Sequence, residues 1–225
     1  MNSFLELKNI SKNFNIEKKI KVLNKLSYNF KKGKVYSLMG PSGSGKSTLL
    51  NLISLIDRPS NGSIRFNNNL INFKENNEND IFRAKKIGIV YQQNNLLPDF
   101  TALENLYLAS LSINDHKKIA ISKAEKLLKK IGLTNRADHY PSQLSGGEAQ
   151  RIAIARAIIN DPDIILADEP TGSLDMKTAK DIFKLLYNQK KPDRLIIFAT
   201  HNRFFANKAD YLLELTDGSI KTANG

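Results

Sequence analysis

The chain has 225 residues, which is enough for one domain with a substantial core, and no low-complexity break divides it. It contains no cysteine, which excludes disulfides and thiolate metal sites and suits a reducing compartment such as the cytosol. No stretch approaches the roughly 18 uninterrupted apolar residues of a membrane-spanning helix, and the N-terminus shows no basic leader followed by an apolar block. We therefore expect any membrane role to be exercised through a partner.

The formal net charge of +12 points to anionic partners, either nucleic acid or an anionic membrane surface. The lysines are nevertheless spread along the chain in short runs, which is typical of solvated faces and helix ends. We interpret the charge mainly as a solvated surface, with attraction to a membrane or to nucleic acid as the alternatives.

The first part of the chain predicts an antiparallel start that leads into a phosphate site. Residues 4–7, 21–30 and 34–39 favour strands, with a turn at 31–34 between the last two. Directly after the third strand, residues 40–48 read GPSGSGKST and fit the pattern G-x-x-x-x-G-K-[ST]. The glycines of such a loop let consecutive backbone N–H groups turn toward a phosphate chain.

The context of this phosphate loop (residues 40–48) supports the interpretation. It lies between the strand and a helix expected over residues 48–55, whereas a flexible Gly/Ser linker, the alternative, does not begin and end in apolar elements. Its lysine and hydroxyl groups are placed for the terminal phosphates and a magnesium ion. The candidate binding residues are Gly40, Pro41, Ser42, Gly43, Ser44, Gly45, Lys46, Ser47 and Thr48.

The next segment mixes turns and short strands. Residues 58–62 predict a turn and residues 63–66 a short strand, followed by an asparagine-rich surface loop through Asn79. Residues 87–91 then favour a buried strand.

Helices dominate the middle of the chain. Thr101 and Glu104 form a capping box that opens a helix, and apolar residues recur at helical spacing over residues 115–132. We expect a helical lobe over about residues 94–143.

The last third predicts a parallel sheet. Residues 164–167 and 195–199 are near-continuous apolar runs, the pattern of parallel strands covered on both faces, and residues 179–186 between them favour a helix. This alternation indicates one α/β domain over residues 1–225 with a parallel core sheet.

Two carboxylates follow the strand at residues 164–167. Asp168, at the end of a buried strand in a chain with a phosphate loop, can hold Mg²⁺ together with Ser47. Glu169 can orient or deprotonate the water that attacks the γ-phosphate. The alternative, two acidic residues that close a strand and cap a helix, is common for such a pair alone; the phosphate loop in the same chain favours the magnesium site.

The signature segment (residues 144–150) reads LSGGEAQ and contains a second phosphate candidate. Ser145 and Glu148 form a capping box, which explains the start of a helix running through Ile159. It does not explain Gly146 and Gly147, because each glycine costs about 1 kcal/mol relative to alanine in a helix. Bare amides at a helix N-terminus favour an anion, so we interpret this segment as a second phosphate-binding surface.

These motifs, together with LADEPTGSLD and ATH, resemble the ATP-binding cassette (ABC) family over essentially the whole chain and in the family's order. The resemblance implies a P-loop NTPase fold of the ABC type, with an antiparallel β lobe and an inserted helical lobe, and ATP and Mg²⁺ as cofactors, with no other metal. It also implies a homodimer in which two copies pack head to tail, so that the signature segment of one copy closes on the ATP of the other.

The resemblance gives individual residues a role. Gln92 becomes a sensor of the γ-phosphate and of Mg²⁺, and His201 becomes a γ-phosphate switch residue, although a histidine in this position alone would be a loop residue. Phe14 is expected to stack on adenine, with a place in the core as the alternative. The expected catalytic residues are Lys46, Gln92, Glu169 and His201, the metal ligands are Ser47, Gln92 and Asp168, and the contacts in trans come from Ser145, Gly146, Gly147, Glu148 and Asp175.

Residues 91–106 and 136–157 are particularly similar to a group within the family that drives lipoprotein release, MacB-type efflux or FtsE-type cell division, with lipoprotein release favoured. In such ATPases residues 92–106 meet the membrane subunits, so the resemblance implies integral membrane partners and peripheral attachment at the cytoplasmic face of the inner membrane. A soluble cassette acting on nucleic acid usually has a coiled-coil insertion or a second cassette, and neither occurs here, so no nucleic-acid partner is expected. A non-hydrolysing regulator is a further alternative.

Overall fold

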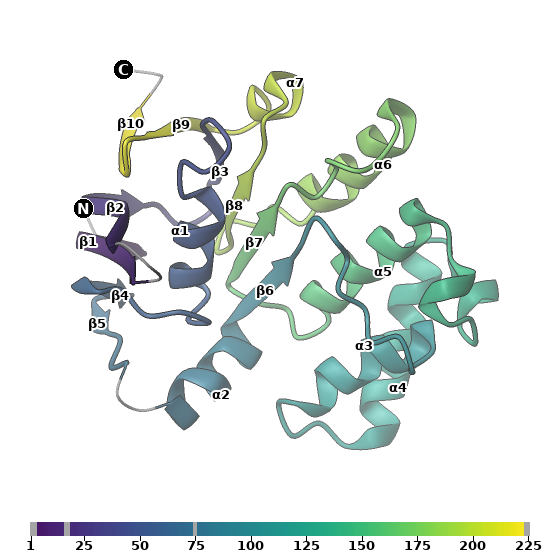
Figure 1. Cartoon of the computed structure of the whole chain (residues 1–225). Coiled ribbons are helices and arrows are strands. Elements are labelled where there is room, and N and C mark those ends of the chain that lie inside the picture. The colour runs from purple at the N-terminus through teal and green to yellow at the C-terminus, as the bar shows by residue number, and fades with distance from the viewer. Residues whose placement is uncertain (1–3, 16–18, 74–75, 223–225) are drawn as a thin grey trace. The chain divides into compact units, whose positions relative to one another are not determined.

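The computed structural model describes residues 4–15, 19–73 and 76–222. Its contacts divide the chain into two compact units, one made of Met1–Asp80 and Lys190–Gly225 and the other of Ile81–Gln189. Strands and helices occur in both units, and Figure 1 labels them along the chain.

An antiparallel sheet with the strand order β2-β1-β4-β5 lies in the first unit. Its strands are β1 (Leu5–Asn15), β2 (Lys19–Phe30), β4 (Asn61–Phe66) and β5 (Asn69–Leu70). On β1, Leu5 and Leu7 alternate onto the buried face, and an irregular register after Leu7, where Asn9 has a φ of 51°, brings Ile10 into the core. The predicted antiparallel start is therefore confirmed, with a first strand longer than expected.

The first unit also contains the strand that leads into the phosphate loop. This strand, β3 (Val35–Met39), pairs in parallel with β8 (Leu195–Ala199) and β9 (Tyr211–Thr216), and β10 (Ser219–Thr222) runs antiparallel to β9. Strands β3 and β8 are buried along nearly their whole length, and the prediction of a covered parallel strand at residues 195–199 is confirmed. Two helices follow these strands, α1 (Lys46–Ile53) after β3 and α7 (Arg203–Ala206) after β8.

In the second unit, β6 (Ile87–Val90) and β7 (Ile164–Asp168) pair in parallel, and α5 (Gly146–Ile158) packs on β6. The remaining helical elements are α3 (Ala102–Leu111), α4 (Lys117–Lys130), α6 (Met176–Tyr187), η1 (Thr134–Arg136) and η2 (Pro141–Gln143), and α2 (Asn76–Lys86) precedes β6. Small side chains along α5, among them Ala149 and Ala153, let it approach Leu106 and Leu128 in one apolar cluster.

The helices of the middle segment agree with the sequence-based prediction. The capping box at Thr101 is present, since its side chain accepts from the Glu104 amide while the Glu104 carboxylate accepts from the Thr101 amide. Helix α4 ends just before Gly132, whose φ is 74°, as expected of a residue beyond a helix C-terminus.

The asparagine-rich segment was predicted wrongly as a loop. We expected a surface loop through Asn79, but β5 and α2 form there. Helix α2 has Glu78 in its first turn and basic residues in its last turn, so its charges complement the helix dipole. The low helix propensity of the asparagines outweighed this charge pattern when the segment was predicted from sequence.

Candidate functional site

The phosphate loop connects the carboxyl end of β3 to α1. Gly40 has a φ of 147° and Gly45 has a φ of 100°. A Cβ at Gly40 would lie 2.3 Å from the carbonyl oxygen of Leu215, and one at Gly45 would lie 2.9 Å from Val22 Cγ1. Both positions therefore require glycine for conformation and for space. The predicted placement between a strand and a helix N-terminus is confirmed.

The N-terminus of α1 has no side chain that competes for its amides. Its N-cap residue is Gly45, no side chain caps it, and its first turn holds no acidic residue. Lys46 Nζ donates to the carbonyl oxygens of Gly40 (2.8 Å) and Pro41 (3.0 Å), so the ammonium group is held against the loop. Ser44 Oγ is buried with no hydrogen-bond partner among the described residues. Uncapped amides, a cation and a hydroxyl on one short loop form a site suited to an anion.

The other hydroxyl groups of the loop differ in exposure. Ser42 and Ser47 are exposed, and Thr48 is half-buried in the first turn of α1. Exposure leaves Ser47 Oγ accessible to a ligand, and its predicted bond to Mg²⁺ remains a prediction.

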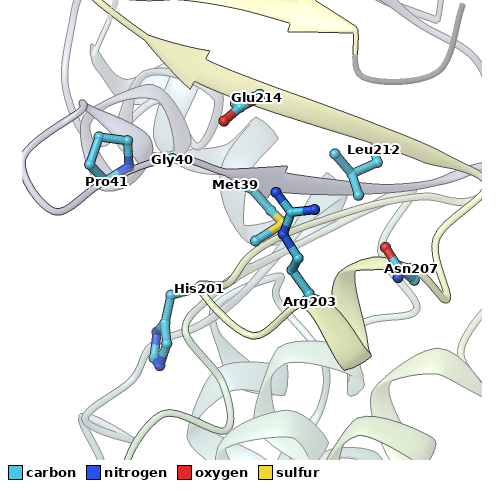
Figure 2. Close-up of a pocket in the computed structure, with 8 residues that line it drawn as sticks. All are labelled: Met39, Gly40, Pro41, His201, Arg203, Asn207, Leu212 and Glu214. Atoms are coloured by element: carbon cyan, nitrogen blue, oxygen red, sulfur yellow. The ribbon is translucent and has the colours of Figure 1, made fainter.

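His201 and the phosphate loop line the same cavity, which has a volume of about 330 Å³ (Figure 2). The lining residues are Met39, Gly40, Pro41, His201, Arg203, Asn207, Leu212 and Glu214. His201 therefore borders the same cavity as the start of the phosphate loop, and its predicted role as a γ-phosphate switch remains a prediction. The charged groups of Arg203 and Glu214 on this cavity were missed by the sequence analysis, because the only signal was that Arg203 follows His201 by two positions.

Phe14 lies near the end of β1, and its side chain is 37 % exposed. Lys12 Nζ lies 4.9 Å from the centroid of the ring, within the range of a cation–π contact. Phe14 is therefore outside the core, which excludes the alternative considered from the sequence. Its stacking on adenine remains a prediction.

Three of the predicted metal ligands and catalytic residues, Gln92, Asp168 and Glu169, lie in the second unit. Asp168 ends β7, and its Oδ1 atom is buried with no hydrogen-bond partner in the described part of the chain. A Cβ at Gly172 would lie 3.1 Å from Gln92 Nε2 and 3.5 Å from Glu169 Cβ, so Gln92 and Glu169 flank the same glycine. Glu169 has a φ of 45°. This left-handed conformation is uncommon for a residue other than glycine and costs about 1–3 kcal/mol, a kind of strain that clusters at active sites.

The signature segment forms the predicted capping box at the start of α5. Ser145 Oγ accepts from the Glu148 amide (3.3 Å), while Glu148 Oε2 accepts from the amide (2.8 Å) and from the hydroxyl of Ser145 (2.8 Å). Glu148 Oε1 also accepts from Arg136 Nε at 2.9 Å. The hydrogen bond from the Ser145 amide and then that from Arg136 lower the pKa of Glu148 to about 2. The carboxylate is thus a fixed anion at this helix end.

The two glycines of the signature segment have different surroundings. A Cβ at Gly147 would lie 2.6 Å from Thr178 Cγ2, so close packing of α5 against α6 accounts for this glycine. At Gly146 the nearest atom, Leu174 Cδ2, would be 3.5 Å away, an ordinary contact, and the residue is exposed. We expected both glycines to serve a phosphate; packing explains Gly147, whereas Gly146 has no packing reason and stays a candidate for phosphate approach.

Asp175 has a structural role that the sequence analysis did not foresee. It is the N-cap of α6, and its Oδ1 atom accepts from the amides of Lys177 (3.0 Å) and Thr178 (3.1 Å). The hydrogen bonds with Thr178 lower the pKa of Asp175, chiefly the one from the Thr178 side chain. Its predicted contact in trans remains a prediction, now beside a capping role.

Comparison with known proteins connects these features. The family model described as "ABC transporter" matches residues 23–172. The lipoprotein-releasing system ATP-binding protein LolD of Rickettsia bellii is 42 % identical over 221 residues, which cover 97 % of this chain and 98 % of the relative. LolD of Bacteroides thetaiotaomicron is 39 % identical over 96 % of this chain and 99 % of the relative.

A solved structure agrees with these relatives. The dimeric ATP-binding cassette MJ0796, in a post-hydrolysis state bound to ADP and phosphate, has a TM-score of 0.89 and 38 % identity, covering 98 % of this chain and 99 % of that chain. The phosphate loop after β3, the carboxylates at the end of β7 and the signature segment at α5 agree with this likeness. The chain therefore belongs to the ABC transporter family and has the fold of its ATP-hydrolysing cassette.

Proposed function

We propose that this ABC ATPase supplies the energy for a transporter that releases lipoproteins from the inner membrane for sorting to the outer membrane. The main support for the proposal is the 42 % sequence identity to LolD of Rickettsia bellii, over 97 % of this chain and 98 % of that relative. Because the likeness covers nearly the whole of both chains, the matched region spans the loop before α3, which we propose meets the partner, as well as the residues around ATP.

The phosphate loop supplies the binding of ATP. Uncapped amides of α1 and the ammonium group of Lys46 meet the β- and γ-phosphates, where the cation offsets the charge that develops as the γ-phosphoryl group leaves. Phe14, with an exposed ring, stacks on the adenine base.

We propose that Ser47, Gln92 and Asp168 hold Mg²⁺. The donor set fits a hard cation, since Asp168 offers a buried carboxylate oxygen with no hydrogen-bond partner among the described residues. The ion, when bound, neutralises phosphate charge. Glu169 accepts a proton from the attacking water, which Gln92 and His201 help to orient, and proton transfer of this kind contributes about 10²- to 10⁴-fold in rate.

Two copies are proposed to pack head to tail, so that residues 145–148 and Asp175 of one copy close on the ATP of the other. Support comes from the exposure of Gly146, Ser145 and Asp175, which leaves this end of α5 accessible. The related cassette MJ0796 was solved as a dimer.

The loop before α3 is proposed to receive the integral membrane subunits, which would be LolC- or LolE-like. Leu97 is 43 % exposed and Phe100 is 38 % exposed on this loop. The buried side chain of Asn105 fixes the backbone of this loop. Its Oδ1 atom accepts from the Leu97 amide (2.8 Å), and its Nδ2 atom donates to the carbonyl oxygens of Leu97, Phe100 and Thr101. Two large apolar side chains are thereby displayed on a fixed backbone, as a docking surface requires.

Within the described ranges, none of the helices is both long enough and apolar enough to pass through a bilayer. We propose that the chain is attached at the cytoplasmic face of the inner membrane through its partner subunits.

Isolation of the tagged chain from detergent-solubilised membranes tests this function. Lipoprotein-releasing subunits should copurify, and a cell-division or MacB-type partner would contradict lipoprotein release while leaving the ATPase intact. The isolated complex, reconstituted with a lipoprotein, should release it on addition of Mg-ATP. Glu169→Gln should abolish release and turnover but keep ATP binding, whereas Glu125→Gln, an exposed carboxylate on α4, should change neither. Turnover by Glu169→Gln at the native rate would contradict the assignment of the base.

A further inference from the structure

Two side chains of α5 hold the backbone on both sides of Gln92. The buried Gln150 donates through Nε2 to the carbonyl oxygen of Tyr91 at 3.0 Å. Arg156 donates through Nη2 to the carbonyl oxygen of Asn94 (2.9 Å) and through Nη1 to that of Asn95 (2.8 Å). Residues 91–95, the sensor segment, are therefore anchored to α5 immediately before and shortly after the predicted γ-phosphate sensor.

The shape of the sensor segment suits this clamp. Asn95 has a φ of 47°, a left-handed conformation that asparagine adopts more readily than most residues, and the carbonyls of Asn94 and Asn95 reach one guanidinium group. The planar fork of arginine can donate to two acceptors at once, which the single ammonium group of lysine cannot do with the same geometry. Burial lowers the pKa of Arg156, as expected for a cation withdrawn from water.

Helix α5 carries the signature segment at its other end. It begins at Gly146, is capped by Ser145, and runs through Arg156 without interruption to Ile158. The clamp therefore joins two functional groups of the second unit, Gln92 and the signature segment, through one continuous helix.

We propose that Gln150 and Arg156 are positioning residues that make Gln92 and the signature segment move as one body and thereby couple the two ATP sites of the dimer. The inference rests on the proposed function, in which copies pack head to tail. Each copy then offers Gln92 to its own ATP and Ser145 to the ATP of the other copy. When Gln92 responds to ATP, α5 carries the signature segment to the neighbouring site, so the two sites bind ATP cooperatively.

Arg156→Met removes both donors and leaves two carbonyls without them, while Gln150→Leu removes the third hydrogen bond. Arg156→Lys keeps the charge and one donor group, so it should restore part of the effect. The matched control is Lys123→Gln on α4, which removes a cation that pairs with Asp115 and not with residues 91–95.

The first measurement is ATPase rate against ATP concentration for the full chain in its membrane complex. We expect a Hill coefficient above 1 for the native chain, a coefficient near 1 with kcat lowered about tenfold for Arg156→Met, and intermediate values for Arg156→Lys. A Hill coefficient of 1 in the native complex would overturn the proposal, as would a native Hill coefficient in Arg156→Met. Absence of any ATPase activity in the native complex would instead refute the proposed function.

A second measurement does not depend on turnover. In Glu169→Gln chains, Mg-ATP should slow the hydrogen exchange of amides in residues 91–97 and 145–150 together. With Arg156→Met added, protection at residues 145–150 should fall about tenfold while residues 40–48 stay protected. Equal protection of both segments with and without Arg156 would contradict the clamp. Cooperative thermal unfolding of each variant shows that the comparison is made between folded chains.

Discussion

The N-termini of α1 and α5 are both assigned to phosphate, yet they satisfy their first amides in opposite ways. At α1 the N-cap is a glycine in a left-handed conformation, no side chain caps the helix, and Lys46 brings a positive charge. At α5 the N-cap Ser145 and the carboxylate of Glu148 form a complete capping box, and the pKa of Glu148 is lowered to about 2, which keeps a negative charge there.

This difference suggests two kinds of site. The end of α1 should bind an anion by itself, whereas the end of α5 should contact an anion that is already bound elsewhere. The end of α1 combines uncapped amides, a cation and the positive end of the dipole, all of which favour phosphate. At the end of α5 the capping box already provides a hydrogen-bond acceptor for one of the first amides, and the Glu148 carboxylate repels an anion. This helix end should therefore contribute to ATP binding only when another copy holds the nucleotide in place, as a contact in trans requires.

The largest expected effect is on the α1 side. Lys46→Ala removes the cation from the phosphate loop and should weaken Mg-ATP binding by about 10- to 100-fold, because hydrogen bonds to charged groups contribute about 1.5–3 kcal/mol. Titration calorimetry with the full chain measures this. Lys126→Ala, which removes an exposed lysine from α4, is the control for net charge. An equal loss of Mg-ATP affinity in both variants would show that Lys46 contributes only through net charge.

The next effect distinguishes the two glycines at the α5 end. Gly147→Ala should lower the free energy of unfolding by about 1–3 kcal/mol, because its Cβ would lie 2.6 Å from Thr178 Cγ2. Gly146→Ala has room for its methyl group and should be neutral or stabilising by up to about 1 kcal/mol.

Urea unfolding compares these variants, and ATP-dependent dimerisation of the same chains provides the second half of the test. Gly146→Ala should impair dimer formation despite its stability, because its methyl group would lie where we propose that the phosphate of the other copy approaches. Normal dimerisation by Gly146→Ala would leave this glycine without a role at the interface.

Removal of the α5 cap should have a smaller effect. Ser145→Ala loses the side-chain acceptor for the Glu148 amide and should reduce the free energy of unfolding by about 1 kcal/mol. Ser142→Ala, an exposed serine in η2, provides a background value in the same urea titrations. If both substitutions have the same effect, the capping box does not stabilise α5.

The smallest effect is a dependence on pH at the same cap. The pKa of Glu148 lies at about 2 in the folded chain, below its ordinary value of 4.5, so the carboxylate stabilises the fold above about pH 4.5 and loses this contribution as the pH falls toward 2. The difference in unfolding free energy between the native chain and Glu148→Gln should therefore shrink as the pH is lowered. An NMR titration of the Glu148 carboxyl group with a midpoint near 4.5 would contradict this account.

The parts of the molecule that were predictable depend on residues close together in sequence. The capping boxes at Thr101 and Ser145 need only positions three apart, and the phosphate loop is specified by nine consecutive residues, so both could be identified before the structure. Carboxylates at the end of an apolar strand likewise follow from local order, because a buried strand places its last residues at the sheet edge.

Features that depend on distant residues could not be predicted. The packing reason for Gly147 requires Thr178 on another helix, and the cavity at His201 requires Glu214 from a later strand. The irregular register at Asn9 shifts the buried face of β1 in a way that alternation alone does not indicate. In each case the cause is a tertiary contact rather than a local preference.

The backbone of Glu169 is left-handed, with a φ of 45°, and this conformation costs the fold some stability. Glycine or asparagine would occupy that conformation with less strain, so Glu169→Gly should raise the thermal stability of the protein while it eliminates turnover. A chain selected only for durability would not keep a glutamate there. With Glu169 as the proposed base, activity and stability oppose each other at position 169, and a screen for heat-resistant variants should recover inactive ones at this position.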